Sequence, residues 1–397
     1  MKKDILFVID SLHCAGAEKS LISLLSLIDY SQYNVDLQLF GYGGILESLI
    51  PKEVNLLEPL KYTKFTEMSL KKGIIHSIKN LDFKPLSSRI HYSIRIRKGK
   101  YTHSQIARIY WQNVSKSIKN NSKKYNIAIS YAQGISTFYV AEKVNAENKF
   151  TWVNTSYYLL EEDKIFQKRF YDKYKKIVAV SNSAKDIFIS TFPDYKNKVE
   201  VIYDINNYQL IYNMSLLSDG YTDSFEGLRI LTIGRLAKGK RYDIAVQACK
   251  ILKDKGIKFR WYVLGEGSLK EEIKKSIEVN DLVEEFVLLG VKANPYPYIK
   301  DCDIYVQTSQ FEGFGLAIAE ARMLNKPVVT TRFDAVYNQM IDGKNGIVVD
   351  INSIAVSKGI EKIITDIELR NSISDYLKSE KKGNVEEIDK FYSLIKQ

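Results

Sequence analysis

Cysteine, proline and glycine are scarce in this 397-residue chain, and their scarcity excludes several classes of protein. The three cysteines, Cys14, Cys249 and Cys302, are too far apart for a disulfide framework or a zinc-binding pattern. Seven prolines and 21 glycines are too few for a collagenous or disordered chain. No apolar run reaches the roughly 18 residues that a membrane-spanning helix needs, and the short apolar run between Asp4 and Asp10 does not resemble a signal peptide. We therefore expect a cytoplasmic protein.

Short β-rich apolar runs alternate with helical patterns along the sequence. The expected strands are 4–9, 34–40, 127–131, 150–153, 177–181 and 199–202 in the first half, and 228–233, 259–264, 286–289, 304–307, 327–330 and 346–349 in the second. This alternation predicts an α/β protein with two Rossmann-like, doubly wound parallel-sheet domains that face a cleft. The polar segment 204–227 predicts the boundary, so we expect domains at 1–204 and 205–379, followed by a last helix within 380–397.

Positive charge is concentrated in one part of the chain. Residues 61–125 contain 16 Lys/Arg and only two acids, Glu67 and Asp82, whereas the remainder has 42 basic and 45 acidic residues. Such a segment attracts polyanions, either nucleic acid or an anionic membrane surface. No helix-turn-helix, zinc finger or RNP-type aromatic motif accompanies the charge, which disfavours nucleic acid as a partner.

Residues 104–120 within this segment have a helical pattern. At about 100° per residue, their apolar side chains, Trp111 among them, fall within an arc of about 140°, and Arg108, Lys116 and Lys119 lie opposite. This pattern is typical of a basic interfacial helix with an aromatic anchor. It is equally typical of a helix whose apolar arc packs on the core of its own domain while the cations are solvated.

A cationic loop follows the expected strand 228–233. The segment Gly234 to Arg241 contains four cations, at positions 235, 238, 240 and 241, just before a helix that starts near Tyr242. Cations beside a helix amino terminus form an anion site suited to a phosphate or diphosphate. The alternative is a solvated basic loop, but a position at a strand end favours a ligand site.

Two glutamates follow the expected strand 304–307. Glu312 lies in a glycine-rich turn, where the backbone can approach a ligand closely. Glu320 lies in a helical pattern whose neighbours three and four residues away, Leu316, Ala317, Met323 and Leu324, are all apolar. A carboxylate in such surroundings needs a partner, which the hydroxyl groups of a sugar or ribose would provide. Either glutamate alone could have a purely structural role; the two together favour a binding site.

These features resemble the retaining glycosyltransferases of family 4, which have the two-domain GT-B fold. The resemblance covers almost the whole chain, is strongest at residues 228–350, and is clearest against members that build bacterial capsule, wall or lipopolysaccharide glycans. It implies that Arg235 and Lys240 hold the diphosphate of a nucleotide sugar, that Glu312 contacts the donor sugar and that Glu320 binds the ribose. It also implies that the last helix crosses back onto the first domain. The remaining positions that the resemblance places at the donor are Gly16, Asn154, Gly234, Phe314, Gly315 and Leu316.

The sequence departs from the family pattern at two places. Only Gly16 remains of the glycine run that usually precedes Ala-Glu-Lys, and Asn154 stands where members often have histidine. An asparagine can hydrogen-bond a sugar hydroxyl but cannot exchange protons, which excludes a general acid/base role there. The Asp-x-Asp letters at Asp301 and Asp303 precede a strand, at the wrong end for a catalytic metal, so we expect a structural turn and neither metal nor cofactor.

The sequence therefore predicts an enzyme with Glu312, Arg235 and Lys240 in the catalytic site. We expect it to move a hexose, with retention, from a nucleotide diphosphate sugar, taken as a UDP-sugar, to a growing lipid-linked bacterial glycan. Residues 61–125 would hold it peripherally on the inner face of the cell membrane. The alternative is a catalytically inactive module that binds nucleotide sugar or glycan as a partner of an active enzyme. Asn154 and the reduced glycine run motivate this alternative.

Overall fold

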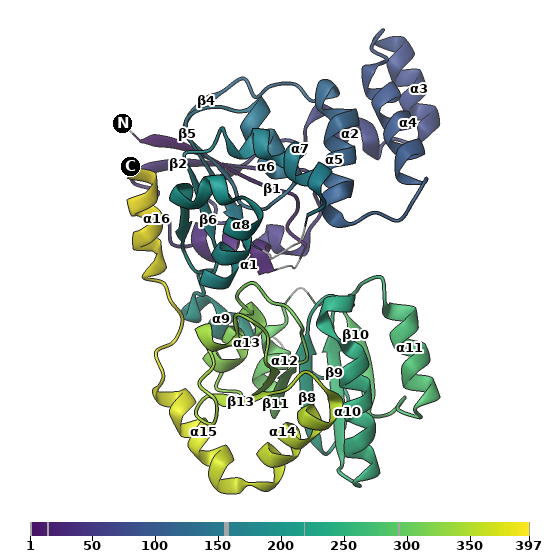
Figure 1. Ribbon diagram of the computed structural model, residues 1–397, viewed down its shortest axis with the longest axis vertical. Helices are drawn as coiled ribbons and strands as arrows, with labels where there is room; N and C mark the ends of the chain where they lie inside the picture. The colour runs from purple at the N-terminus through teal and green to yellow at the C-terminus, as the bar shows by residue number, and fades with distance from the viewer. Residues whose placement is uncertain (1, 14–15, 155–158, 218, 293, 397) are drawn as a thin grey trace. The chain divides into compact units, whose positions relative to one another are not determined.

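The computed structural model describes residues 2–13, 16–154, 159–217, 219–292 and 294–396. The chain forms two compact units, each with its own parallel sheet (Figure 1). Unit 1 comprises Met1–Tyr203 and Glu386–Gln397, and unit 2 comprises Asp204–Val385. The α/β class with two parallel sheets is confirmed. None of the helices within the described ranges is long and apolar enough to span a bilayer.

The sheet of unit 1 has seven strands in the order β3-β2-β1-β4-β5-β6-β7. Its strands are β1 (Lys3–Ile9), β2 (Tyr33–Leu39), β3 (Val54–Leu56), β4 (Lys124–Ser130), β5 (Asn145–Val153), β6 (Lys176–Ala179) and β7 (Val199–Val201). The central strand β1 is buried from Ile5 to Ile9, because a parallel strand covered on both faces has no polar side. The sequence analysis missed β3, whose three residues are too few to show a period.

The helices of unit 1 include the last helix of the chain. They are α1 (Gly16–Leu25), α2 (Lys61–Glu67), α3 (Leu70–Lys79), α4 (Lys84–Ile96), α5 (His103–Val114), α6 (Ile135–Lys143), α7 (Glu161–Tyr171), α8 (Asn182–Thr191) and α16 (Glu387–Lys396). In α16, the Phe391 ring stacks on Phe7 of β1 at 6.1 Å between centroids. The Tyr392 hydroxyl accepts the Asp29 backbone N–H at 2.7 Å. The chain thus returns from unit 2 to complete unit 1.

Unit 2 has six parallel strands in the order β10-β9-β8-β11-β12-β13. These are β8 (Leu228–Ile233), β9 (Phe259–Leu264), β10 (Phe286–Gly290), β11 (Ile304–Gln307), β12 (Val328–Thr331) and β13 (Gly346–Val349). Its helices are α9 (Tyr208–Ser215), α10 (Tyr242–Asp254), α11 (Lys270–Val279), α12 (Tyr296–Asp301), α13 (Leu316–Met323), α14 (Ser353–Thr365) and α15 (Ile367–Ser379). The strand order changes direction between β8 and β11, the place where ligands bind in open parallel sheets.

Of the two interpretations left open for residues 104–120, the structure supports the helix whose apolar arc packs on the core of its own domain. Helix α5 ends at Val114 and is followed by a 3₁₀ turn, Ser115–Ser117. Trp111 is fully buried, packs on Phe138 and donates its indole N–H to Glu142 at 2.9 Å, so it cannot anchor in a membrane. Arg108 is not simply solvated, because its guanidinium pairs with Asp163 at 2.6 Å. The apolar arc packs on the core of unit 1.

Candidate functional site in unit 2

Two loops meet at the switch point of the unit 2 sheet. One follows β8 and carries the cations, and the other follows β11 and carries Glu312. The Gln310 N–H donates to the Gly239 carbonyl at 2.9 Å. The Thr308 hydroxyl donates to the Lys240 carbonyl at 2.8 Å. Because β8 and β11 are neighbours, residues about 70 positions apart in sequence are brought together.

Lys240 and Glu312 form the charged centre of this junction. The Lys240 ammonium lies 2.5 Å from Glu312 Oε1, and the two side chains are 22% and 13% exposed. The same oxygen accepts the Ser309 hydroxyl at 2.6 Å and the Gln307 amide N–H at 3.0 Å. Three donors on one carboxylate oxygen hold the side chain in place.

Local backbone geometry places Lys240 beside Gly234. A Cβ at Gly234 would lie 3.4 Å from Lys240 Cε, and the Tyr242 hydroxyl donates to the Gly234 carbonyl at 2.9 Å. The loop ends at Arg241 in the left-handed conformation, with φ of 51°. Because this conformation is uncommon for a residue with a Cβ, the surrounding contacts must enforce it. Arg235 is exposed on the same loop.

Glu320 is buried in α13 and is 1% exposed. The Tyr296 hydroxyl, from α12, donates to Glu320 Oε1 at 3.1 Å. Tyr305 of β11 lies near both glutamates: burial raises the pKa of its phenol well above the ordinary value, and the charges of Glu312 and Glu320 raise it further. The sequence analysis missed Tyr296 and Tyr305, because neither belongs to a recognisable spacing.

A glycine turn joins Glu312 to α13. Gly315 has φ of 82° and precedes Leu316, the first residue of the helix. The Gln339 amide N–H group donates to the carbonyls of Phe314 and Gly315, the latter at 3.1 Å. A Cβ at Gly315 would lie 2.8 Å from Gln339 Nε2, so only glycine fits both the space and the conformation. The loop 308–315 connects β11 to α13, and the free N–H groups of the first turn of a helix suit an anion.

The predicted site residues are divided between the two units. Gly234, Arg235, Lys240, Glu312, Phe314, Gly315, Leu316 and Glu320 belong to unit 2, whereas Gly16 and Asn154 belong to unit 1. Gly16 starts α1. Asn154 follows β5, and both polar atoms of its side chain are buried without a hydrogen-bond partner in the part of the chain that the structure describes.

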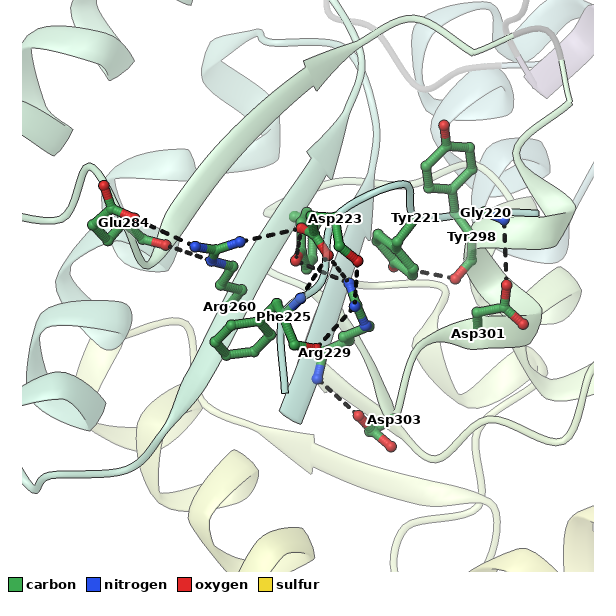
Figure 2. Close-up of polar contacts among 11 residues, drawn as sticks. Gly220, Tyr221, Asp223, Phe225, Arg229, Arg260, Glu284, Tyr298, Asp301 and Asp303 are labelled. Carbon is green, nitrogen blue, oxygen red and sulfur yellow. Dashed lines mark hydrogen bonds and ion pairs between the residues drawn. The ribbon is translucent and has the colours of Figure 1, made fainter. Parts of the chain in front are cut away.

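Asp301 and Asp303 lie at the opposite end of β11 from Glu312, where their carboxylates accept hydrogen bonds from backbone N–H groups. Asp303 Oδ2 accepts the Arg229 N–H at 2.7 Å, and Asp301 Oδ2 accepts the Gly220 N–H at 3.3 Å. Figure 2 shows these contacts beside Asp223, which lies between the guanidinium groups of Arg229 and Arg260. Both carboxylates thus have structural partners, and this network fixes the start of unit 2 on its sheet. The described residues contain no group of three or more His, Cys, Asp or Glu arranged to hold a metal ion.

Part of the chain matches a known protein family. Residues 226–380, which lie wholly within unit 2, match the model of Glycosyl transferases group 1. The chain is 28% identical over 215 residues to the N-acetylgalactosamine-N,N'-diacetylbacillosaminyl-diphospho-undecaprenol 4-alpha-N-acetylgalactosaminyltransferase of Campylobacter jejuni, covering 54% of this chain and 57% of that protein. It is 27% identical over 238 residues to a poly(ribitol-phosphate) alpha-N-acetylglucosaminyltransferase of Staphylococcus aureus, covering 58% and 43%. The chain thus spans about half the length of these relatives.

Solved structures match the fold over nearly the whole chain. Anabaena HepE in complex with UDP and glucose has a TM-score of 0.69 at 18% identity, covering 99% of this chain and 98% of that one. A variant of S. aureus TarM in complex with UDP has a TM-score of 0.65 at 15% identity and covers 100% of both chains. The two-sheet architecture is therefore the GT-B fold, and the described site lies within the segment that matches Glycosyl transferases group 1.

Proposed function

We propose that the protein is a retaining glycosyltransferase that moves a hexose from a nucleotide diphosphate sugar, a UDP-sugar, to a growing lipid-linked bacterial surface glycan. The observation that carries this proposal is the Lys240–Glu312 pair beside the start of α13, at the switch point of the unit 2 sheet. The family match of residues 226–380 and the bacterial relatives support it. In this proposal, unit 2 binds the donor and unit 1 receives the acceptor.

Cleavage of the bond between the sugar and the diphosphate places negative charge on the leaving group. Lys240, Arg235 and the first N–H groups of α13 would stabilise that charge without a metal ion or another cofactor. A bound diphosphate would compete with Glu312 for the Lys240 ammonium. The Glu312 carboxylate, still held by Ser309 and Gln307, would then accept hydrogen bonds from hydroxyl groups of the donor sugar.

Glu320 and Asn154 have supporting roles in this proposal. Glu320 would accept a ribose hydroxyl, with Tyr296 orienting its carboxylate. The unpartnered amide of Asn154 would hydrogen-bond a sugar hydroxyl, and it cannot act as an acid or base. The acceptor would therefore lose its proton to the departing diphosphate or to water. Residues 61–125 would hold the protein peripherally at the inner face of the cell membrane.

The test is release of nucleoside diphosphate from a panel of UDP-sugars, with product stereochemistry followed by NMR. Lys240→Ala should lower kcat by about 10²-fold or more, the usual effect of removing one group that stabilises the leaving charge. Glu312→Ala should also lower turnover strongly, because the donor sugar loses its hydrogen-bond acceptor and Lys240 loses its partner. Lys238→Ala is the matched control, because Lys238 is an exposed lysine of the same loop. A chelator should leave the rate unchanged. Donor binding without turnover, even with a lipid-linked acceptor, would instead identify an inactive binding module.

A further inference from the structure

Exposed apolar side chains gather on one helical hairpin of unit 1. We define the α3–α4 hairpin as residues 70–96, comprising α3, the turn at 80–83 and α4, which lie side by side in Figure 1. Eight large apolar residues of this hairpin are more than 40% exposed: Leu70, Ile74, Ile75, Ile78, Leu81, Phe83, Ile90 and Ile94. Isolated exposed apolar residues are normal on a protein surface, but a cluster of this size marks an interaction site.

The exposed residues follow the helical period. Leu70, Ile74 and Ile78 recur every four residues on α3, and Ile90 and Ile94 do so on α4, so each helix carries an exposed apolar stripe. The turn between the helices carries Leu81, which is 84% exposed and left-handed with φ of 50°. A leucine in this conformation is strained, and at this exposure it buries little apolar surface, which points to a role in binding.

The hairpin attaches to unit 1 by a different set of groups. Gly73 and Ser77 are the buried residues of α3, and Gly73 faces the Phe65 ring of α2. Arg89 of α4 donates to the carbonyls of Phe65 and Met68, the latter at 2.8 Å. No residue of α4 is fully buried. The apolar stripes therefore stay exposed and are not buried against other residues in the described part of unit 1.

Cations surround these stripes. Residues 70–100 contain nine Lys/Arg and a single acid, Asp82, whose carboxylate accepts the Lys84 backbone N–H. Lys71, Lys72, Lys79 and Lys84 are all exposed. Isoleucines flanked by lysines suit a surface that is apolar inside and anionic outside, because lysine stems can lie along the apolar part while their ammonium groups reach the charged layer. A nucleic acid would leave the isoleucines in water.

We propose that the α3–α4 hairpin is the element that docks the protein on an anionic lipid bilayer, with Leu81 and Phe83 inserted below the headgroups. This assignment replaces α5, whose tryptophan is buried in the core. It refines the membrane contact of the proposed function, since a lipid-linked acceptor lies at that surface. Binding itself does not depend on which reaction the protein catalyses.

The experiment measures partitioning of the full-length chain onto vesicles of phosphatidylcholine, with and without phosphatidylglycerol. We expect at least tenfold stronger binding to the anionic vesicles, and at least a tenfold loss between 0.1 M and 1 M salt, where the screening length falls from about 10 Å to about 3 Å. The double variants Leu81→Glu/Phe83→Glu and Ile74→Glu/Ile78→Glu should each weaken binding at least tenfold. The matched control is Val279→Glu/Val283→Glu, which adds the same charge at two exposed valines of unit 2.

A second readout follows insertion directly. The tryptophan fluorescence of Leu81→Trp should shift to the blue only with anionic vesicles. The native tryptophans, Trp111, Trp152 and Trp261, are all buried and should contribute a constant signal. The proposal is overturned if hairpin and control variants bind vesicles equally, or if the wild type is a dimer that the hairpin variants dissociate. Nucleoside diphosphate release without vesicles should be unchanged in the hairpin variants. Absence of that activity from a wild-type protein that still binds anionic vesicles would contradict the proposed function and not the docking.

Discussion

Asp10 is a titratable residue that the sequence analysis did not single out. It directly follows β1 and accepts the Ser136 hydroxyl at 3.0 Å. Burial raises the pKa of its carboxyl from 3.8 to about 6, and repulsion from Glu18 adds to the rise, while the hydrogen bonds from Ser136 oppose it. A carboxyl whose pKa is higher in the folded state stabilises the fold fully below pH 4, and this contribution is lost as the pH rises through 6.

We therefore predict that Asp10→Asn stabilises unit 1 more at pH 7.5 than at pH 4.5. The shift of about two pH units corresponds to at most about 3 kcal/mol in the free energy of unfolding. Thermal unfolding of wild type and variant at the two pH values measures the difference. Ser136→Ala serves as the control, because removing its hydrogen bond should raise the pKa of Asp10 further and move the wild-type pH dependence upward. An Asp10→Asn effect that is the same at both pH values would contradict the prediction.

At the scale of elements, the features that the sequence predicted best are those set by neighbouring residues, namely the strands and the loops that follow them. The twelve expected strands are all present because each is a short, buried, β-rich run, and the two loops that carry Lys240 and Glu312 follow directly from strand ends. The partners of these residues could not be predicted in the same way. Tyr296 and Gln339 reach the site from other elements, and only the folded topology brings them there. The hairpin's exposed stripes were also invisible, because helical periodicity does not tell which side a helix buries.

Gln339 links the glycine turn to the end of unit 2. Its side-chain amide donates to the carbonyls of Phe314 and Gly315, and its backbone carbonyl accepts the Asn345 side-chain amide at 3.0 Å. Asn345 also donates to Glu380 at 3.2 Å, and Glu380 pairs with Arg322 of α13. Both ends of this chain of contacts therefore constrain α13, through the turn that precedes it and through Arg322.

We predict that Gln339→Leu weakens UDP binding at least fivefold by calorimetry, because the turn before α13 loses both of its side-chain donors. Under the proposed function, KM for the donor should rise more than kcat falls, since the residue positions the turn and does not touch the reacting atoms. Asn338→Leu is the matched control, as Asn338 is the exposed neighbour. Equal UDP affinity in the two variants would show that Gln339 has only a structural role.

At the scale of the whole molecule, each unit has its own core, yet unit 1 is completed from the far end of the chain. Phe391 of α16 is fully buried and contacts Phe7 and Trp152, so a strand from the start of the sequence and a helix from its end share one cluster. The chain passes through all of unit 2 before this cluster can form. The core of unit 2, around Trp261, contains no residue of α16.

Because the two cores are separate, damage to α16 should appear in unit 1 alone. We predict that Phe391→Ala lowers the free energy of unfolding of unit 1 by about 3–5 kcal/mol, the usual cost of a large-to-small change in a core. Hydrogen exchange in mild denaturant, read peptide by peptide, should show β1 and β5 opening sooner while β8 and β11 keep wild-type protection. Tyr392→Phe, which removes one hydroxyl and no core volume, should change both units far less. If β8 and β11 open together with β1 in the Phe391→Ala variant, the units share one cooperative transition and this division of the molecule fails.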